Sequence, residues 1–77
     1  MMQRFFQSNA AQLVSLVLER GLTIREAATA AGLSTETFSN LIRRDKRISF
    51  RTAGKLSRTF GATSVNYVLK GGEENDG

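Results

Sequence analysis

Apolar residues recur at helical spacing along most of the chain, and the first such run covers residues 10–20. Asn9 precedes this run as an N-cap, Gln12 follows at the third helical position, and Gly21 provides a stop. The apolar side chains spread over more than half of the helix circumference. We therefore predict a first helix over residues 10–20 that is buried on more than one side, either at the centre of the core or through a subunit contact.

Two more helices are predicted between residues 23 and 43. Thr23 and Glu26 form a capping box, and Gly32 ends the second helix because glycine readily adopts the left-handed conformation. Ser34 then caps a third helix. Its inner face carries Phe38, Leu41 and Ile42.

The C-terminal half predicts two helices and no sheet. Ser49 caps a fourth helix that ends near Gly61, and Thr63 or Ser64 caps a short fifth helix. That last helix would turn Val65, Val68 and Leu69 inward. No long segment alternates with period two, so the expected fold is all-α with five helices. Only residues 5–6 leave room for an extended arm.

The domain organisation follows from these elements. We predict an N-terminal arm over residues 1–8, one folded domain over residues 9–70, and a disordered acidic tail over residues 71–77. A chain of 77 residues has room for one small domain.

The link between the second and third helices carries the strongest structural signal. Only residues 32–34 join the two helices, so the helices must cross steeply, and a small residue is needed where they meet. Ala28, four residues before Gly32, meets that need. This pattern is typical of a helix-turn-helix, in which one helix braces and the other is presented outward.

The amino-acid composition argues against most classes of enzyme. The chain has no cysteine and no histidine, which excludes disulfides, thiolate nucleophiles, imidazole bases and the usual zinc ligand sets. We expect no catalytic residues, no metal site and no cofactor.

The charge distribution points to a polyanion. Eleven Lys and Arg oppose seven Asp and Glu, but three of the acids lie in the last five residues, so residues 1–70 carry +7 from eleven bases and four acids. A small basic domain favours nucleic acid over a membrane surface as partner. The longest apolar stretch, residues 13–18, is too short to span a membrane, and we expect a cytoplasmic protein without a membrane partner.

The chain resembles the lambda-repressor-like, or Cro-type, helix-turn-helix regulators. The resemblance covers about residues 9–70 and rests on residues 22–28 (LTIREAA), 32–34 (GLS), 38–39 (FS), 41–43 (LIR), 47–49 (RIS), 52–53 (TA), 56–57 (LS), 60–61 (FG) and 67–69 (YVL). Residues 46–67 look most like the HigA-type antitoxins. Many members have Gln where this chain has Ile24, so Arg25 would have to take the phosphate contact of that Gln.

The third helix is the candidate DNA reader. By the resemblance, its N-terminal half enters the major groove, and the chemistry of its outward side chains suits base edges. Asn pairs with adenine, Glu accepts from cytosine, and the Thr methyl contacts thymine. The predicted base-reading residues are Thr35, Glu36, Ser39 and Asn40. An equally good interpretation of Glu36 is that its carboxylate offsets the helix dipole at the start of this helix.

A basic run directly after the reader helix is the candidate phosphate-binding segment. Four of the five residues from 43 to 47 are basic, and the fourth helix starts after Ser49 without a carboxylate in its first turn. The predicted phosphate-binding residues are Arg25, Ser34, Arg43, Arg44, Lys46, Arg47 and Ser49. The stripe of Arg51, Lys55 and Arg58 is predicted to be a solvated face.

Two further positions carry expectations. Gly54 costs its helix about 1 kcal/mol relative to Ala, which a closely approaching helix would explain. Tyr67 is predicted to be a core or dimer-contact aromatic.

The sequence therefore predicts a double-stranded-DNA-binding transcriptional regulator, most simply a repressor, that binds as a homodimer. An antitoxin that regulates its own operon and binds a toxin partner is the alternative. A protein-interaction module that reuses the fold without DNA is a third class.

Overall fold

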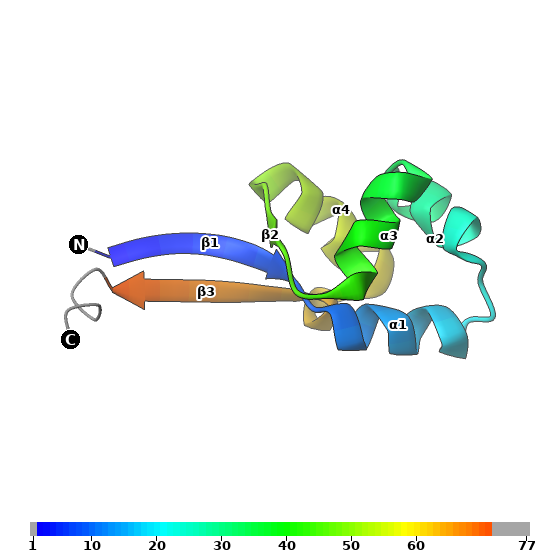
Figure 1. Ribbon diagram of the computed structural model, residues 1–77, viewed down its shortest axis with the longest axis horizontal. Helices are drawn as coiled ribbons and strands as arrows, with labels where there is room; N and C mark the ends of the chain where they lie inside the picture. Colours follow the sequence, from blue (N-terminus) through cyan, green and yellow to red (C-terminus); the bar gives the residue numbers. More distant parts are fainter. Residues whose placement is uncertain (1, 72–77) are drawn as a thin grey trace.

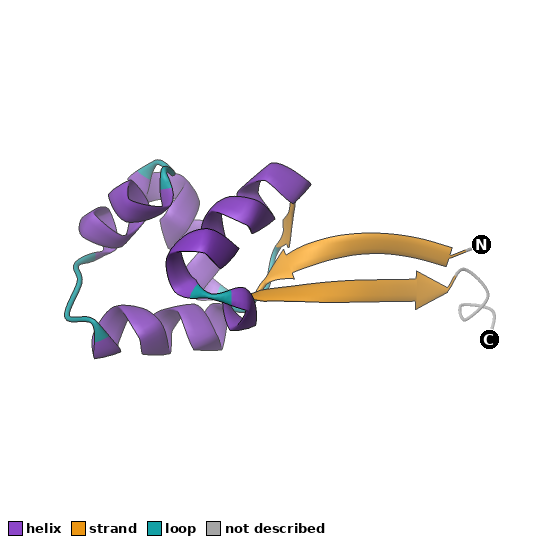
Figure 2. Cartoon of the chain, turned by 180° about the vertical axis from the view of Figure 1, so that it is seen from behind, coloured by secondary structure: helices purple, strands orange, loops and turns teal. Residues whose placement is uncertain are grey.

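The computed structural model describes the backbone of residues 2–71 and the side chains of residues 4–68. Helices gather at one end, and two long strands project from them as a ribbon (Figure 1), which the view from behind shows equally (Figure 2). None of the helices within the described residues is long and apolar enough to cross a membrane. In chain order the elements are β1 (Met2–Ser8), α1 (Ala10–Glu19), α2 (Ile24–Ala31), α3 (Thr35–Arg43), β2 (Arg47–Ile48), α4 (Phe50–Phe60), the 3-10 turn η1 (Ala62–Ser64) and β3 (Val65–Gly71).

The four predicted N-caps are confirmed. In each case the side-chain oxygen of the cap accepts a hydrogen bond from the backbone N–H three residues later, which satisfies a free donor of the first turn. Glu26 also accepts from the N–H of its cap, which completes the predicted capping box. The caps are Asn9, Thr23, Ser34 and Ser49.

The turn between α2 and α3 has the predicted construction. Gly32 ends α2 in the left-handed conformation, with φ of 72°, and the N–H of Leu33 donates to the carbonyl of Ala28 at 2.9 Å. Ala28 itself is completely buried. A larger side chain at this position would have to displace neighbours, because Ala28 belongs to the buried core cluster.

One hydrophobic core holds the helices together. Leu13 of α1, Phe38 of α3 and Leu56 of α4 are completely buried, and the rings of Phe38 and Phe60 stack with centroids 5.8 Å apart. Apolar residues of α2 complete the cluster. The core residues therefore come from all four helices, as their spacing in the sequence predicts.

Helix α1 is less buried than expected. Val14 is 38% exposed and Leu18 is 74% exposed, whereas Leu13 and Val17 face the core. The prediction of burial on more than one side is wrong for a single chain, because only one face of α1 has helices packed on it. The exposed face of α1, which includes Val14 and Leu18, leaves a subunit contact as the remaining alternative.

The predicted fifth helix is wrong, and so is the prediction that the chain has no sheet. Residues 65–71 form strand β3 in a three-stranded antiparallel sheet of order β2-β1-β3. The hydroxyl of Ser64 donates to the carbonyl of Gly61 at 2.7 Å and closes η1, so Ser64 does not cap a helix. The β-branched and aromatic residues that follow instead pair with β1, with Phe6 opposite Tyr67.

The expected N-terminal arm is the middle strand of this sheet. Its apolar residues do not alternate, because both faces are partly covered: Phe6 contacts Phe50 of α4, with ring centroids 5.7 Å apart, and the guanidinium of Arg47 lies over the ring of Phe5. Two adjacent aromatic residues therefore occur in one strand without a period-two pattern. Gly71 ends β3, and the rest of the predicted acidic tail, residues 72–77, lies outside the described residues.

Ser8 fixes the end of β1 to the segment that follows α3. Its side chain is completely buried, its hydroxyl accepts from the N–H of Lys46 at 3.0 Å, and its own N–H donates to the carbonyl of Lys46 at 2.9 Å. The neighbouring N–H of Asn9 donates to the carbonyl of Ser64. These bonds join three segments that are far apart in the sequence.

We expect Ser8→Ala to lower the free energy of unfolding by about 1–3 kcal/mol, because the N–H of Lys46 loses its side-chain partner. Urea denaturation followed by circular dichroism measures this change. Ser15→Ala on the exposed face of α1 is the matched control and should be nearly neutral. Equal stability of the two variants would contradict the role given to Ser8.

Candidate nucleic-acid interface

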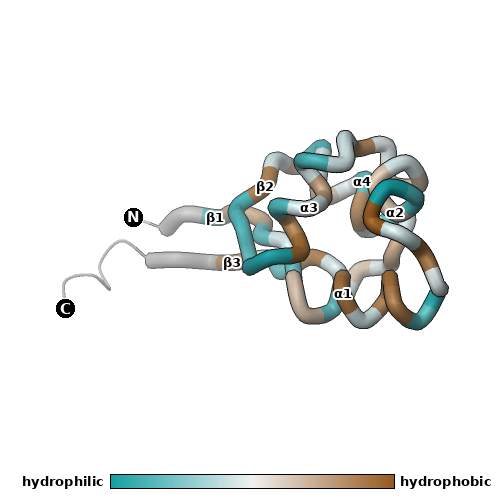
Figure 3. The backbone as a smooth tube through the Cα atoms, turned by 45° about the vertical axis from the view of Figure 1, so that its right-hand side comes forward, coloured by the Kyte–Doolittle hydropathy of each residue, from teal (hydrophilic) through white to brown (hydrophobic). Residues whose placement is uncertain are grey.

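The segment from residue 43 to residue 47, here called the basic loop, lies at the end of α3 and leads into β2. Its four cationic side chains, Arg43, Arg44, Lys46 and Arg47, are all exposed. Figure 3 shows this part of the backbone as a hydrophilic stretch between α3 and β2. The four basic side chains of the predicted phosphate-binding run are therefore all accessible at the surface.

Asp45, the acid within the basic loop, is bonded to α1. Its Oδ1 accepts a hydrogen bond from the N–H of Ala10 at 2.9 Å, at the first turn of α1. A carboxylate at this position also offsets the positive end of the helix dipole. Since this interaction occupies Asp45, the carboxylate is held against α1 instead of among the cations.

A polar hollow of about 300 Å³ lies where α3 meets the basic loop. It is lined by Asn40, Arg43, Arg44 and Lys46. Three cations and one amide around a concave surface make a site for an anion that lies next to a hydrogen-bonding partner. The structure thus brings one predicted base-reading residue together with three predicted phosphate-binding residues.

A second hollow of about 240 Å³ continues this surface to the start of α4. Asn40 and Lys46 line both hollows. The second hollow also includes Ser49, whose helix begins with no acid in its first turn. Backbone N–H groups at such a helix start attract phosphate, so Ser49 and Lys46 line one hollow whose chemistry suits an anion.

Arg47 is the most constrained cation of the basic loop. Its guanidinium carbon lies 4.5 Å from the centroid of the Phe5 ring, which is a cation–π contact. Strand β1 therefore orients Arg47 and leaves its charge at the surface.

The other predicted base-reading residues lie outside both hollows. Thr35 and Glu36 are exposed in the first turn of α3, and Ser39 is half-buried. Of the other predicted phosphate-binding residues, Arg25 is exposed on α2, and the hydroxyl of Ser34 donates to Thr37 Oγ1 at 2.8 Å.

Sequence reasoning missed two threonines that line the second hollow. Thr37 and Thr52 each stand three residues after a serine cap, and each hydroxyl accepts from the hydroxyl of that cap, at 2.8 Å and 3.2 Å. The repeated Ser-x-x-Thr spacing was the available signal. Because Thr37 is one turn before Asn40, it belongs to the same side of α3.

The prediction of a solvated stripe on α4 is wrong for Lys55. Its Nζ donates to the carbonyl of Gly32 at 3.1 Å, so this lysine caps the C-terminal end of α2 and braces the helix turn. Arg51 and Arg58 are exposed as predicted.

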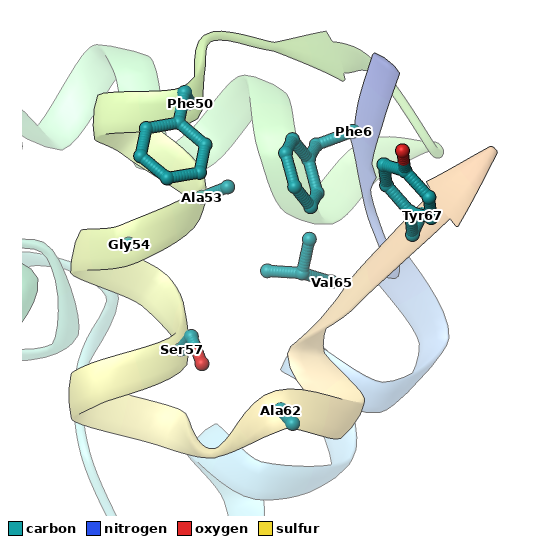
Figure 4. Close-up of a pocket in the computed structure, with 8 residues that line it drawn as sticks. All are labelled: Phe6, Phe50, Ala53, Gly54, Ser57, Ala62, Val65 and Tyr67. Carbon is teal, nitrogen blue, oxygen red and sulfur yellow. The ribbon is translucent and has the colours of Figure 1, made fainter. Parts of the chain in front are cut away.

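An apolar groove of about 340 Å³ lies between α4 and the sheet (Figure 4). Its walls include Phe50, 79% exposed, and Tyr67, 57% exposed, so Tyr67 is not a core residue. Gly54 lies in the same groove, and a Cβ atom there would meet nothing within 4 Å. The close helix approach suggested for Gly54 is therefore absent from the described part of the chain.

A family model described as helix-turn-helix matches residues 14–68, which contain α2, α3 and the turn between them. The chain belongs to this helix-turn-helix family, which is of the lambda-repressor and Cro type. Domains of this family bind DNA and regulate transcription, and they are generally not enzymes. Comparisons with curated proteins and with solved structures gave no significant match.

We expect Asp45→Ala to destabilise this helix-turn-helix domain by about 1 kcal/mol, because α1 loses a hydrogen-bonded carboxylate at its first turn. Thermal unfolding measures the loss. Glu36→Ala is the control, because it removes the same charge and the same favourable interaction with a helix dipole, so any greater loss in Asp45→Ala measures the hydrogen bond to Ala10. The role of Asp45 is refuted if both variants unfold at the same temperature.

Proposed function

We propose that this helix-turn-helix protein is a sequence-specific regulator of transcription that binds double-stranded DNA through α3 and acts as a repressor by occupying a promoter. The observation that carries the proposal is the hollow where Asn40 of α3 adjoins three cations of the basic loop. A surface that carries both an amide and cations can contact a base edge and a phosphate of the same duplex.

Base reading is assigned to the outward side of α3. Asn40 is the leading candidate, because its amide both donates and accepts and therefore suits the N6 and N7 atoms of adenine. Thr35 and Glu36 are exposed in the first turn, where they are available to neighbouring bases, and Ser39 lies beside Asn40.

Phosphate binding is assigned to the basic loop and to the start of α4. The four cations of the loop supply charge, and Ser49 marks the free backbone N–H groups of the next helix. We assign Arg25 of α2 and Ser34 at the start of α3 to phosphates farther along the same DNA strand.

Binding as a homodimer is part of the proposal. One reader helix covers only a few base pairs, whereas two copies about 34 Å apart read two half-sites on one side of the duplex. The operator is then an inverted repeat.

We expect Asn40→Ala to relax the base preference at one operator position, at a cost of about 1–3 kcal/mol for the preferred base. Competition binding against duplexes changed at single positions measures it. Equal weakening on every duplex would contradict base reading by Asn40.

We expect Arg43→Ala to weaken binding on all sequences and to reduce the slope of log affinity against log salt by about 1. Arg58→Ala is the matched control, because Arg58 is exposed in the last turn of α4, outside both hollows, and its loss removes the same charge. If the two variants have the same salt slope, the hollow is not a phosphate site.

Selection of bound duplexes from a random pool at two salt concentrations tests the proposed function as a whole. An enriched inverted repeat supports a dimeric sequence reader. Binding that falls with salt but enriches no sequence overturns it.

A further inference from the structure

Strand β1 supports Arg47, one cation of the basic loop, from the neighbouring strand. Strand β2 lies beside β1 (Figure 1), and its Arg47 pairs with Gln7. Paired residues share one face of a sheet, and residues two apart in a strand share it as well. Phe5 is therefore the diagonal neighbour of Arg47 on that face, and its ring centroid lies 4.5 Å from the guanidinium carbon. This distance is well within the range of a cation–π contact.

Phe5 has no comparable contact elsewhere in the described part of the chain. Its neighbour Phe6 points to the opposite face, where its ring contacts those of Phe50 and Tyr67 with centroids 5.7 Å and 5.0 Å away. Phe5 is half-buried, belongs neither to the core cluster nor to the residues packed on it, and makes no aromatic pair among the described residues. The packing of the helices therefore does not account for a phenylalanine at position 5, whereas the contact with Arg47 does.

An aromatic ring holds a guanidinium without cancelling its charge. The ring attracts a cation through the electron density of its face but carries no net charge, whereas a carboxylate would form an ion pair. Asp45, the nearest acid in the sequence, accepts instead from the N–H of Ala10 at 2.9 Å. A guanidinium also has five N–H donors, more than one ring occupies, so donors remain for a second ligand. Arg47 is thus held in place and still available to an anion.

The held side chain lines the hollow that joins the basic loop to α4. Arg47 is exposed and lines this second hollow together with Lys46 and Ser49. Among the described residues it is the one cation of the basic loop that lies over an aromatic ring. A free arginine loses side-chain entropy when it binds a phosphate, and a residue that orders the side chain beforehand removes part of that cost. The contact with Phe5 therefore favours phosphate binding at this position.

We propose that Phe5 is a positioning residue for DNA binding, which acts by holding Arg47 where it contacts a phosphate of the duplex. The inference rests on the proposed function, since that function assigns Arg47 to DNA. It extends the DNA-binding machinery to β1, because the helix-turn-helix match begins at residue 14 and leaves out Phe5. Phe5 itself does not contact the DNA, and its effect depends entirely on the arginine.

A double-mutant cycle between Phe5 and Arg47 tests this coupling. We expect Phe5→Leu to weaken binding to a duplex about two- to fivefold, the range of one cation–π contact at an exposed site. In the Arg47→Ala background the same change should have no effect, because the ring has lost its partner. The probe is a short fluorescein-labelled duplex of mixed sequence, read by fluorescence anisotropy, since phosphate contacts do not depend on sequence.

The slope of log affinity against log salt separates positioning from direct contact. Phe5→Leu keeps every charge and should leave the slope unchanged, whereas Arg47→Ala should reduce it by about 1 per subunit. Phe5→Tyr keeps the aromatic face and should bind as tightly as the unchanged protein.

Two further variants control for the fold of the strand. Phe6→Leu makes the same change at the neighbouring position of β1, and any effect it has should be equal with and without the Arg47 side chain. Phe5→Ile, whose β-branched side chain suits a strand, repeats the cycle. Circular dichroism checks that each variant keeps its helices.

The outcomes separate this inference from the proposed function. Coupling between Phe5→Leu and Arg47→Ala, with rescue by Phe5→Tyr, supports the inference. Equal weakening by Phe5→Leu in both backgrounds, no weakening in either, or an unchanged salt slope in Arg47→Ala overturns it and leaves the proposed function intact. Loss of the helices in both Phe5→Leu and Phe5→Ile also overturns it, because Phe5 is then needed for folding. Absence of salt-dependent binding of the unchanged protein to the duplex overturns the proposed function, and this inference with it.

Discussion

The attachment of Ser8 to Lys46 is the constraint on which the rest of this structure depends. A buried hydroxyl and a backbone N–H of one strand hold the segment that follows α3, and the adjacent N–H of Asn9 holds Ser64 before β3. The same few atoms therefore fix the sheet, the end of α3 and the position of the basic loop. Because buried polar groups are costly without partners, this junction tolerates little displacement.

The surface proposed to bind DNA follows from that junction. With Lys46 fixed, Asp45 reaches the first turn of α1, and the four cations of the basic loop stay at the surface. Asn40 then shares one hollow with Arg43, Arg44 and Lys46. The interface is thus built from a helix, a loop and a helix start that the sheet holds together, so its geometry is more rigid than that of a free basic loop.

The ribbon of β1 and β3 starts from the same junction. Its base is fixed to the end of α3 by Ser8, and its open edge is a seven-residue strand. The position of the ribbon relative to α3 is therefore set by backbone and side-chain hydrogen bonds and not by a flexible linker.

The sequence by itself determined the four helices and the turn between α2 and α3. Each cap bonds to an N–H only three residues away, and Gly32 needs only its own backbone conformation, so these features are encoded locally. Net charge and the basic run are likewise properties of composition. Family resemblance added the assignment of α3 as the reader.

Only the tertiary structure decided that residues 65–71 are a strand, that residues 2–8 are its neighbour, and that Asp45 faces α1 while Lys55 caps α2. These contacts join residues 23 to 69 positions apart, and their free energy arises only after the chain has closed those loops. These long-range contacts cannot be predicted from local spacing and capping patterns. The spacing of Val65, Val68 and Leu69 therefore predicts a helix, whereas pairing with β1 makes this segment a strand.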